Sequence, residues 1–273
     1  MMRRLSWVGI TATTVIFLYA CATSPTGRSQ LILVSDSQMR AMGAEAFTQM
    51  QQETPVARGT PEARYVQCIT DAITSVVGGN ETWEVQTFQS DAVNAFALPG
   101  GKIGVYTGLL KVAETQDQLA AVIGHEIAHV LAKHSAARVS NQLATQLGVS
   151  VLAGATGTNP ELIGMGANLL LVMPHGRGDE SEADLLGMNY MAQAGFNPAA
   201  AADLWVNMAR ASGGNSPPEF MSTHPSHSTR IRDIQNYLPN VRPIYEQARA
   251  QGHPGLLQAG VDGVEALEGR GVD

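Results

Sequence analysis

The chain has 273 residues, of which 44% are hydrophobic, so it is long enough to bury the core of one sizeable domain with short appendages. Its formal net charge is -7 at pH 7. An acidic chain of this kind is poorly suited to bind nucleic acid, so we expect no nucleic-acid partner.

The first twenty residues are typical of an export signal, because Arg3 and Arg4 precede an apolar stretch over residues 5 to 20. That stretch is too short for a membrane span. Leu-Tyr-Ala-Cys at residues 18 to 21 matches a bacterial lipobox, in which a small residue precedes the cysteine that receives the lipid. We therefore expect a signal peptide, a lipid anchor on Cys21 and a location on the periplasmic face of a bacterial outer membrane. An uncleaved signal anchor is the alternative.

The segment after this signal is rich in Ser, Pro, Thr and Gly, which is typical of a tether between a lipid anchor and a folded body. Ser35 or Asp36 is placed to cap a helix that runs to about Gln52. Thr60 followed by Pro61 predicts the start of a second helix, which should reach residue 77.

The sheet region is predicted between residues 83 and 106, where β-branched and alternating residues replace the helical pattern. After it the chain is predicted to be helical, and the class is therefore α+β with a dominant helical part. The expected helices span residues 108–113, 116–139, 142–172 with interruptions, 178–194, 198–211, 228–238 and 242–250. Residues 154–161 split the apolar stretch 143–173 into pieces too short to cross a membrane.

A His-Glu-x-x-His motif lies at residues 125 to 129 on one of these predicted helices. An α-helix advances about 100° per residue, so His125 and His129 project from one face and can share a cation. Glu126 lies beside them and can act on a water molecule without being a metal ligand. Two histidines and a free carboxylate in this order predict zinc-dependent hydrolysis, but a catalytic zinc needs a third protein ligand.

Two patterns compete to supply that third ligand. A third histidine ten residues after the first would require His at position 135, where the chain has Ser135, and a glycine at position 132, where it has Ala132. His134 is one residue out of register and points to the opposite face of a continuous helix. We therefore interpret His134 as an exposed or helix-end histidine. A supporting contact to the metal site is the less favoured interpretation.

The other pattern is a downstream acidic segment at residues 179 to 184. Glu180 and Asp184 are four residues apart and share a helix face, so Glu180 can reach the metal while Asp184 fixes a ligand imidazole by a hydrogen bond. Glu182 projects from a different face of the helix than Glu180 and Asp184. A solvated acidic start of a helix is the alternative explanation.

Together these motifs resemble the HtpX-like and CAAX-prenyl-protease-like family of gluzincin metallopeptidases, in particular its soluble bacterial lipoprotein branch. The resemblance covers roughly residues 26 to 240. It rests on the segments 26–31, 94–101, 125–129, 180–184 and His224-Pro225 with Arg230. The family's Glu-x-x-x-Asp pattern selects Glu180 over Glu182 as the third zinc ligand.

The resemblance also implies roles for residues outside the metal motif. The segment matching Asn94, Ala95, Phe96 and Ala97 is an edge strand that pairs with extended substrate in that family. The matching His-Pro lies close to the metal there, which implies that His224 is a removable fourth ligand. Arg230 is expected to bind a substrate carbonyl or carboxylate.

The predicted organisation is a signal peptide over 1–20, a lipidated tether over 21–34, a zinc metallopeptidase domain over 35–250 and a disordered tail over 251–273. The predicted function is hydrolysis of peptide bonds in misfolded or unassembled cell-envelope proteins, with Glu126 as general base. The expected partners are extended polypeptides, the membrane and outer-membrane assembly machinery. Two alternatives stay open: a metal-stabilised chaperone or binding lipoprotein with little proteolysis, and a structural lipoprotein with an accidental motif.

Overall fold

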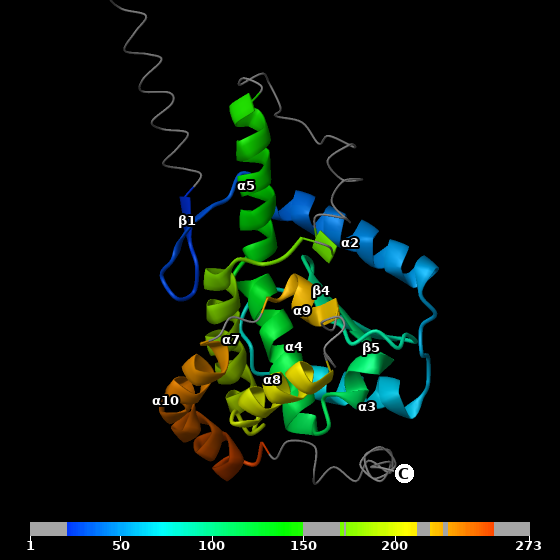
Figure 1. Cartoon of the computed structure of the whole chain (residues 1–273), viewed down its shortest axis with the longest axis vertical. Coiled ribbons are helices and arrows are strands. Elements are labelled where there is room, and N and C mark those ends of the chain that lie inside the picture. Colours follow the sequence, from blue (N-terminus) through cyan, green and yellow to red (C-terminus); the bar gives the residue numbers. More distant parts are fainter. Residues whose placement is uncertain (1–20, 150–169, 172, 212–218, 226–228, 254–273) are drawn as a thin grey trace, which may run out of the picture.

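The computed structural model describes residues 21–149, 170–171, 173–211, 219–225 and 229–253. The predicted signal peptide, most of the stretch 154–173 and all but the first three residues of the predicted tail fall outside these residues. Helices surround a small sheet, as Figure 1 shows, so the predicted α+β class with a dominant helical part is confirmed. No helix within the described ranges is long and apolar enough to cross a membrane.

The N-terminal segment differs from the open tether predicted for residues 21 to 34. Strands β1 (Cys21–Thr23) and β2 (Ser29–Leu31) form an antiparallel hairpin. Gln30 Nε2 donates to the carbonyl of Ala132, at 3.0 Å, and Leu33 N–H donates to Ser140 Oγ, at 2.8 Å. These long-range hydrogen bonds hold the segment, which was predicted as a lipidated tether, against the helical body.

The first two helices begin at the predicted residues. Helix α2 (Asp36–Glu53) is capped by Ser35, whose side chain and that of Gln38 form a capping box. Helix α3 (Pro61–Thr74) is capped by Thr60, with proline at its first position. It ends three residues before the predicted position 77, at the Gly-rich connection to the sheet.

The sheet has three strands in the order β3-β5-β4. Strand β3 (Glu84–Phe88) pairs parallel with β5 (Lys102–Tyr106), and β4 (Ala95–Leu98) pairs antiparallel with the other side of β5. Strand β4 therefore has one neighbour and forms an edge of the sheet. A short 3-10 helix, η1 (Thr107–Lys111), leads from β5 into the helical part.

The helix predicted over residues 116 to 139 is two helices, α4 (Gln116–Leu131) and α5 (His134–Val149). The break occurs at Lys133, which has a positive φ of 56°. A left-handed residue other than glycine ends a helix at some cost, and neither Gly nor Pro marks this position in the sequence. The break redirects the chain so that His134 starts a new helix.

The remaining described helices are α7 (Arg177–Gln193), α8 (Ala200–Ala211), the short α9 (Glu219–Thr223) and α10 (Arg230–Ala250). Helices α7 and α8 pack against the side of α4 that faces away from the sheet, and α10 packs against α7 and α8. Helix α10 replaces the two helices predicted over 228–238 and 242–250. Pro239 and Pro243 lie inside it and are exposed, so the carbonyl groups that they leave without helical donors can bond water.

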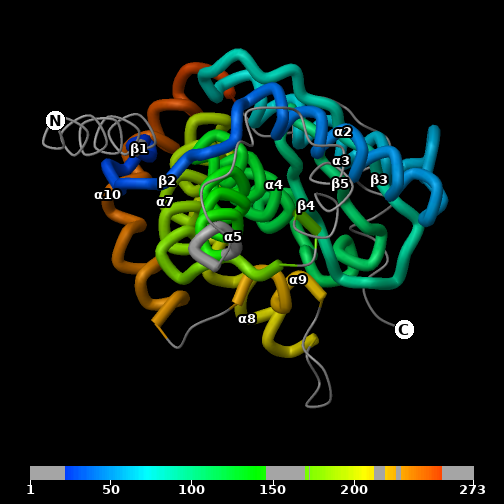
Figure 2. Tube along the Cα trace, turned by 90° about the horizontal axis from the view of Figure 1, so that it is seen from above, coloured from blue at the N-terminus to red at the C-terminus, as the bar shows by residue number. Residues whose placement is uncertain are grey.

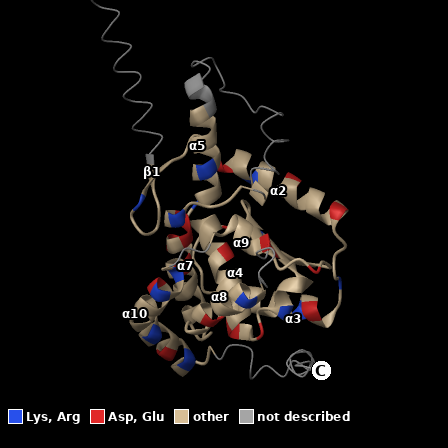
Figure 3. Cartoon of the chain, viewed as in Figure 1, with Lys and Arg blue, Asp and Glu red and all other residues tan. Residues whose placement is uncertain are grey.

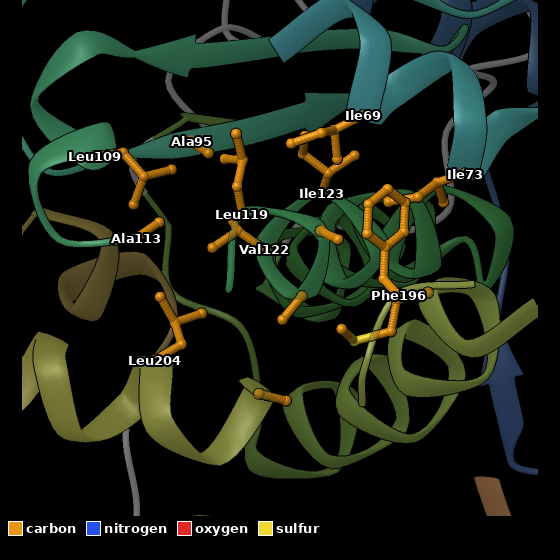
Figure 4. Close-up of a cluster of buried hydrophobic side chains, with 14 of the residues drawn as sticks. Ile69, Ile73, Ala95, Leu109, Ala113, Leu119, Val122, Ile123, Phe196 and Leu204 are labelled. Carbon is orange, nitrogen blue, oxygen red and sulfur yellow. The ribbon is translucent and has the colours of Figure 1, made fainter. Parts of the chain in front are cut away.

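The core is organised around α4, which lies between the sheet with α3 on one side and α7 and α8 on the other (Figures 1 and 2). Figure 4 shows Ile69 and Ile73 of α3 meeting α4, with Leu204 of α8 on the opposite side. Nearly every residue of α4 from Gln116 to His129 is buried. A helix with apolar neighbours all round is held rigidly, which suits it to position functional side chains.

Candidate active site

Helices α4 and α7 cross at a pair of glycines. A β-carbon built at Gly187 would lie 2.8 Å from the backbone nitrogen of His125, and one built at Gly124 would lie 2.9 Å from the carbonyl oxygen of Gly187. Only glycine allows the two backbones to approach so closely. The crossing brings the predicted ligands on α4 close to Glu180, two turns before Gly187 on α7.

Four buried side chains converge beside this crossing: His125, His129, Glu180 and His224. Their candidate ligand atoms all lie within 4.8 Å of one another. The Nε2 atoms of His125 and His129 are 3.0 Å apart, and Glu180 Oε1 lies 3.3 Å from His129 Nε2. His224 Nδ1 lies 3.2 Å from His125 Nε2 and 3.1 Å from Glu180 Oε1.

These distances fit a metal. Ligands at about 2.0–2.1 Å from a tetrahedral zinc ion lie roughly 3.3–3.4 Å from each other. Three imidazole nitrogens and one carboxylate oxygen are the donor types that zinc prefers. The residues present could therefore hold one metal ion, with His125, His129 and Glu180 as the predicted set and His224 beside them.

Arg230 occupies a different position from the predicted one. Its side chain is 1% exposed, and Nη1 donates to Glu180 Oε2 while Nη2 donates to Asp184 Oδ1, both at 2.7 Å. The guanidinium also lies 3.6 Å from the ring centroid of Trp205. Because these groups enclose the guanidinium, the prediction that Arg230 contacts substrate is wrong: it holds the acidic residues of the site in place.

Asp184 contacts His125 as predicted, with Oδ1 3.0 Å from Nδ1. Burial disfavours a charged imidazole, but the hydrogen bonds to Asp184 and Glu180 outweigh it and raise the pKa of His125 to about 9. By contrast, burial lowers the pKa of His129 well below its usual value. A proton on the His125 imidazole would compete with a metal ion for this ligand.

His134 is the residue whose surroundings differ most from those predicted from the sequence. It is fully buried, and its Nδ1 lies 2.9 Å from His129 Nδ1 while its Nε2 lies 3.2 Å from Glu182 Oε2. The interpretation of His134 as exposed assumed one continuous helix, and the break at Lys133 turns its side chain inward. His134 thus links His129 to a buried carboxylate, an arrangement that fixes the orientation of a metal-binding imidazole.

Glu182 is in turn held by the N-terminal hairpin. Its Oε2 accepts a hydrogen bond from Arg28 Nη1 at 2.8 Å, and its Oε1 accepts from the backbone N–H and hydroxyl of Thr26 at 3.1 and 2.7 Å. Burial raises the pKa of Glu182, but hydrogen bonds from Ser24, Thr26 and His134 outweigh it and lower this pKa to about 2. No spacing rule links residues 26 and 182, so this chain of contacts could not have been predicted from the sequence.

Glu126 lies between the cluster and the sheet. Its Oε2 accepts a hydrogen bond from Ala97 N–H at 3.0 Å, and its Oε1 lies 3.3 Å from His224 Nε2. Burial raises the pKa of Glu126, so its carboxylate is a better proton acceptor than an exposed one. Oε1 makes no hydrogen bond with any described residue, and the imidazole of His224 is beside it.

A cleft of about 300 Å³ opens beside Glu126 and is lined by Asn94, Ala95, Phe96 and Ala97 as well as His224. Tyr106 N–H donates to the carbonyl of Asn94, so residues 94, 96 and 98 face β5 with their backbone groups. The backbone groups of the alternate residues Ala95 and Ala97 point away from β5, toward the open edge of the sheet. Strand β4 therefore presents main-chain groups to the cleft, beside Glu126.

His175, whose surroundings could not be predicted from the sequence, also lines this cleft. Its ring centroid lies 3.9 Å from that of His129 and 5.1 Å from that of His224. The short helix α9, which no sequence pattern predicted, carries Phe220 against the ring of His224 at 4.4 Å between centroids. Stacking on both faces holds His224 near the cluster.

Comparison with known proteins agrees with this geometry. The model of Peptidase family M48 matches residues 61–238. The mitochondrial metalloendopeptidase OMA1 of Schizosaccharomyces pombe is 38% identical over 184 residues, which cover 67% of this chain and 55% of that protein. OMA1 of Saccharomyces cerevisiae is 35% identical over 173 residues, or 61% and 50% of the two chains. The β-barrel assembly-enhancing protease of Yersinia pestis is 28% identical over 232 residues, or 80% and 47%.

These relatives contradict the predicted location on the periplasmic face of a bacterial outer membrane. The two fungal relatives are named mitochondrial, and both are more similar to this chain than the bacterial relative is. The predicted location rested on the N-terminal pattern alone. A positively charged N-terminus followed by an apolar stretch does not reliably identify the membrane to which a protein is directed. The chain spans about half the length of the curated relatives it matches.

The family match covers more than half of the chain and includes the whole His-Glu-x-x-His motif, α7 and His224. The resemblance to the gluzincin family of metallopeptidases is thereby confirmed. The chain belongs to Peptidase family M48.

Proposed function

We propose that the protein is a zinc-dependent endopeptidase that binds polypeptides in extended form, with His125, His129 and Glu180 as the zinc ligands. The observation that carries this proposal is the buried cluster whose ligand atoms lie within 4.8 Å of one another. A bound zinc ion supplies Lewis acidity toward water and toward the carbonyl of the bond to be cut. The residues around it supply orientation and proton transfer.

Glu126 acts as the general base in this proposal. Its Oε1 takes a proton from the attacking water and later delivers it to the leaving amine. The hydrogen bond from Ala97 N–H to Oε2 holds the carboxylate in one orientation. The raised pKa of Glu126 supports the second step, because a weaker acid retains the proton until the amine leaves.

Strand β4 is the proposed binding site for substrate. The backbone groups of Ala95 and the carbonyl of Ala97 on its open edge can pair with any extended chain, which implies loose sequence preference. Misfolded or unassembled proteins expose such segments, and we propose them as substrates. The lipid anchor on Cys21, the associated domain limits and a partner among membrane assembly proteins stay predictions.

His224 is the proposed removable fourth ligand. Its Nδ1 lies close enough to His125 and Glu180 to share their ion, while its Nε2 faces Glu126. In this position the imidazole occupies the space that water needs beside Glu126. Movement of α9 and the residues after it would withdraw His224 and open the site.

The first experiment tests the endopeptidase itself. Purified wild-type protein and Glu126→Gln are loaded with equal zinc, measured by metal analysis, and incubated with unfolded casein. The amide keeps the size of the side chain but cannot take the proton, so we expect a loss of at least about a hundredfold in rate with zinc retained. Substantial cleavage by the zinc-loaded variant would refute the role of Glu126. Zinc binding without cleavage by wild type would favour a metal-stabilised binding protein.

The second experiment tests His224 by comparing His224→Ala with wild type at matched zinc content. Removal of a fourth ligand predicts faster cleavage and one fewer nitrogen in a zinc-edge absorption spectrum. A large loss of rate with unchanged coordination would instead indicate that His224 stabilises the transition state. Unchanged rate and coordination would contradict both roles.

A further inference from the structure

One end of the cleft beside β4 is acidic. Glu53, at the end of α2, and Glu219, at the start of α9, both line it, with Asn94 between β3 and β4 contributing its amide. Figure 3 shows acidic positions both at the C-terminal end of α2 and on α9. Burial raises the pKa of Tyr106 to about 12, and the charges of Glu219 and Glu53 add to this effect. Both carboxylates therefore lie near the same phenol and line the same cleft.

Asn94 is an unsatisfied group within this acidic end. Its side chain donates from Nδ2 to Glu219 Oε1 at 3.1 Å, but Oδ1 is buried without a hydrogen-bond partner in the described part of the chain. The residue as a whole is 7% exposed. Buried acceptors in native structures are nearly always paired, so Oδ1 is expected to receive a donor from a bound molecule.

No positive side chain of the described residues balances these acids within the cleft, because its lining contains neither Lys nor Arg. Glu53 accepts a hydrogen bond from the neutral Gln49, at 2.7 Å. Two carboxylates and a free carbonyl oxygen together provide only acceptors. The chemistry that fits them is a cation with several N–H donors, such as an ammonium or guanidinium group.

The separation between Asn94 and Ala97 along β4 indicates how far the acidic end of the cleft lies from the bond that is cut. Ala97 contacts Glu126, and Asn94 precedes it by three residues, or about 10 Å along an extended strand. In a substrate paired with β4, the side chain that reaches Asn94 would thus belong to a residue about three positions from the cleaved bond. Antiparallel pairing would put that residue on the C-terminal side of the bond.

We propose that Glu53, Glu219 and Asn94 form a specificity subsite for a lysine or arginine side chain of the substrate, about three residues from the cleaved bond. This proposal rests on the proposed pairing of substrate with β4. The subsite adds a preference for basic residues to a main-chain interaction that is otherwise indifferent to sequence. It selects among unfolded chains by charge.

The test uses a fluorogenic peptide series in which one lysine is moved from the fourth position before the cleaved bond to the fourth position after it. Each peptide is compared with the same peptide carrying norleucine, which keeps the length of the side chain without its charge. We expect kcat/KM to favour lysine by about tenfold at one position, through a lower KM, and the preference to weaken in high salt.

The variants Glu53→Gln and Glu219→Gln should each lower the lysine-to-norleucine ratio about threefold, and the double variant should bring it close to one. Glutamine keeps an oxygen that can accept the hydrogen bond from Asn94. Glu45→Gln is the matched control, because Glu45 is an exposed acid on α2 that does not line the cleft. It should leave the ratio unchanged.

The outcomes separate this inference from the proposed function. Equal cleavage of lysine and norleucine peptides at every position would overturn the subsite while leaving the endopeptidase intact. A lysine preference that survives the double variant would also overturn it. If no peptide is cut by the zinc-loaded enzyme, the proposed function itself fails.

Discussion

The close crossing of α4 and α7 predicts an unusual response to the substitution Gly187→Ala. At an ordinary helical position this change stabilises a protein by about 1 kcal/mol, because alanine has the higher helix propensity. Here the new methyl group would lie 2.8 Å from the nitrogen and 3.0 Å from the Cα of His125. Both neighbours are backbone atoms and cannot rotate away.

The magnitude follows from the contact distances. Non-bonded atoms of this kind settle at about 3.5 Å, so the two helices must separate by roughly 0.5 Å. Overpacking of a core on this scale costs about 1–3 kcal/mol, or a fall of about 2–10 °C in Tm for a chain of this size. Zinc tolerates about 0.2 Å in its ligand distances, so the shift between Glu180 and His125 should also weaken zinc binding by at least about tenfold.

The assay measures thermal unfolding of the metal-free protein and zinc affinity by competition with a fluorescent chelator. Gly78→Ala is the control, because a β-carbon at Gly78 meets nothing within 4 Å. Gly124→Ala, whose methyl group would meet chiefly the carbonyl oxygen of Gly187, provides a milder second variant. An unchanged or raised Tm with unaltered zinc affinity in Gly187→Ala would refute the argument that this crossing sets the separation of the ligands.

Three further predictions follow from buried contacts of the site. His134→Ala removes the group that orients His129, so zinc affinity should fall about tenfold to a hundredfold in the chelator assay; wild-type affinity would contradict this. Arg230→Met leaves the carboxylate of Glu180 buried without its cation, so the metal-free protein should lose about 3–5 kcal/mol in urea unfolding; a loss below about 1 kcal/mol would show that the pair is not needed. Tyr106 stays protonated to about pH 12 when folded but only to about pH 10 when unfolded, so its contribution to stability is lost as pH rises between these values. The urea midpoint of Tyr106→Phe should therefore decline less than that of wild type between pH 9 and 11, and parallel declines would exclude this contribution.

Local signals in the sequence were sufficient for the parts of the molecule that depend on neighbouring residues. Ser35 and Thr60 cap helices because each side chain accepts a hydrogen bond from an N–H group three residues on. The period of the helix likewise placed His125 and His129 on one face, and family M48 membership was recognisable from their motif.

Tertiary structure alone decided what surrounds the metal-binding face. The break at Lys133 carries no glycine or proline, and it alone turns His134 from the surface toward His129. The pairing of Arg28 with Glu182 and the enclosure of Arg230 join segments that are far apart along the chain. Periodicity describes one helix at a time, whereas these contacts depend on how closely helices cross, which here is set by Gly124 and Gly187. The sequence therefore determined which residues could bind a metal, and the packing of α4, α5 and α7 decided which residues hold them in place.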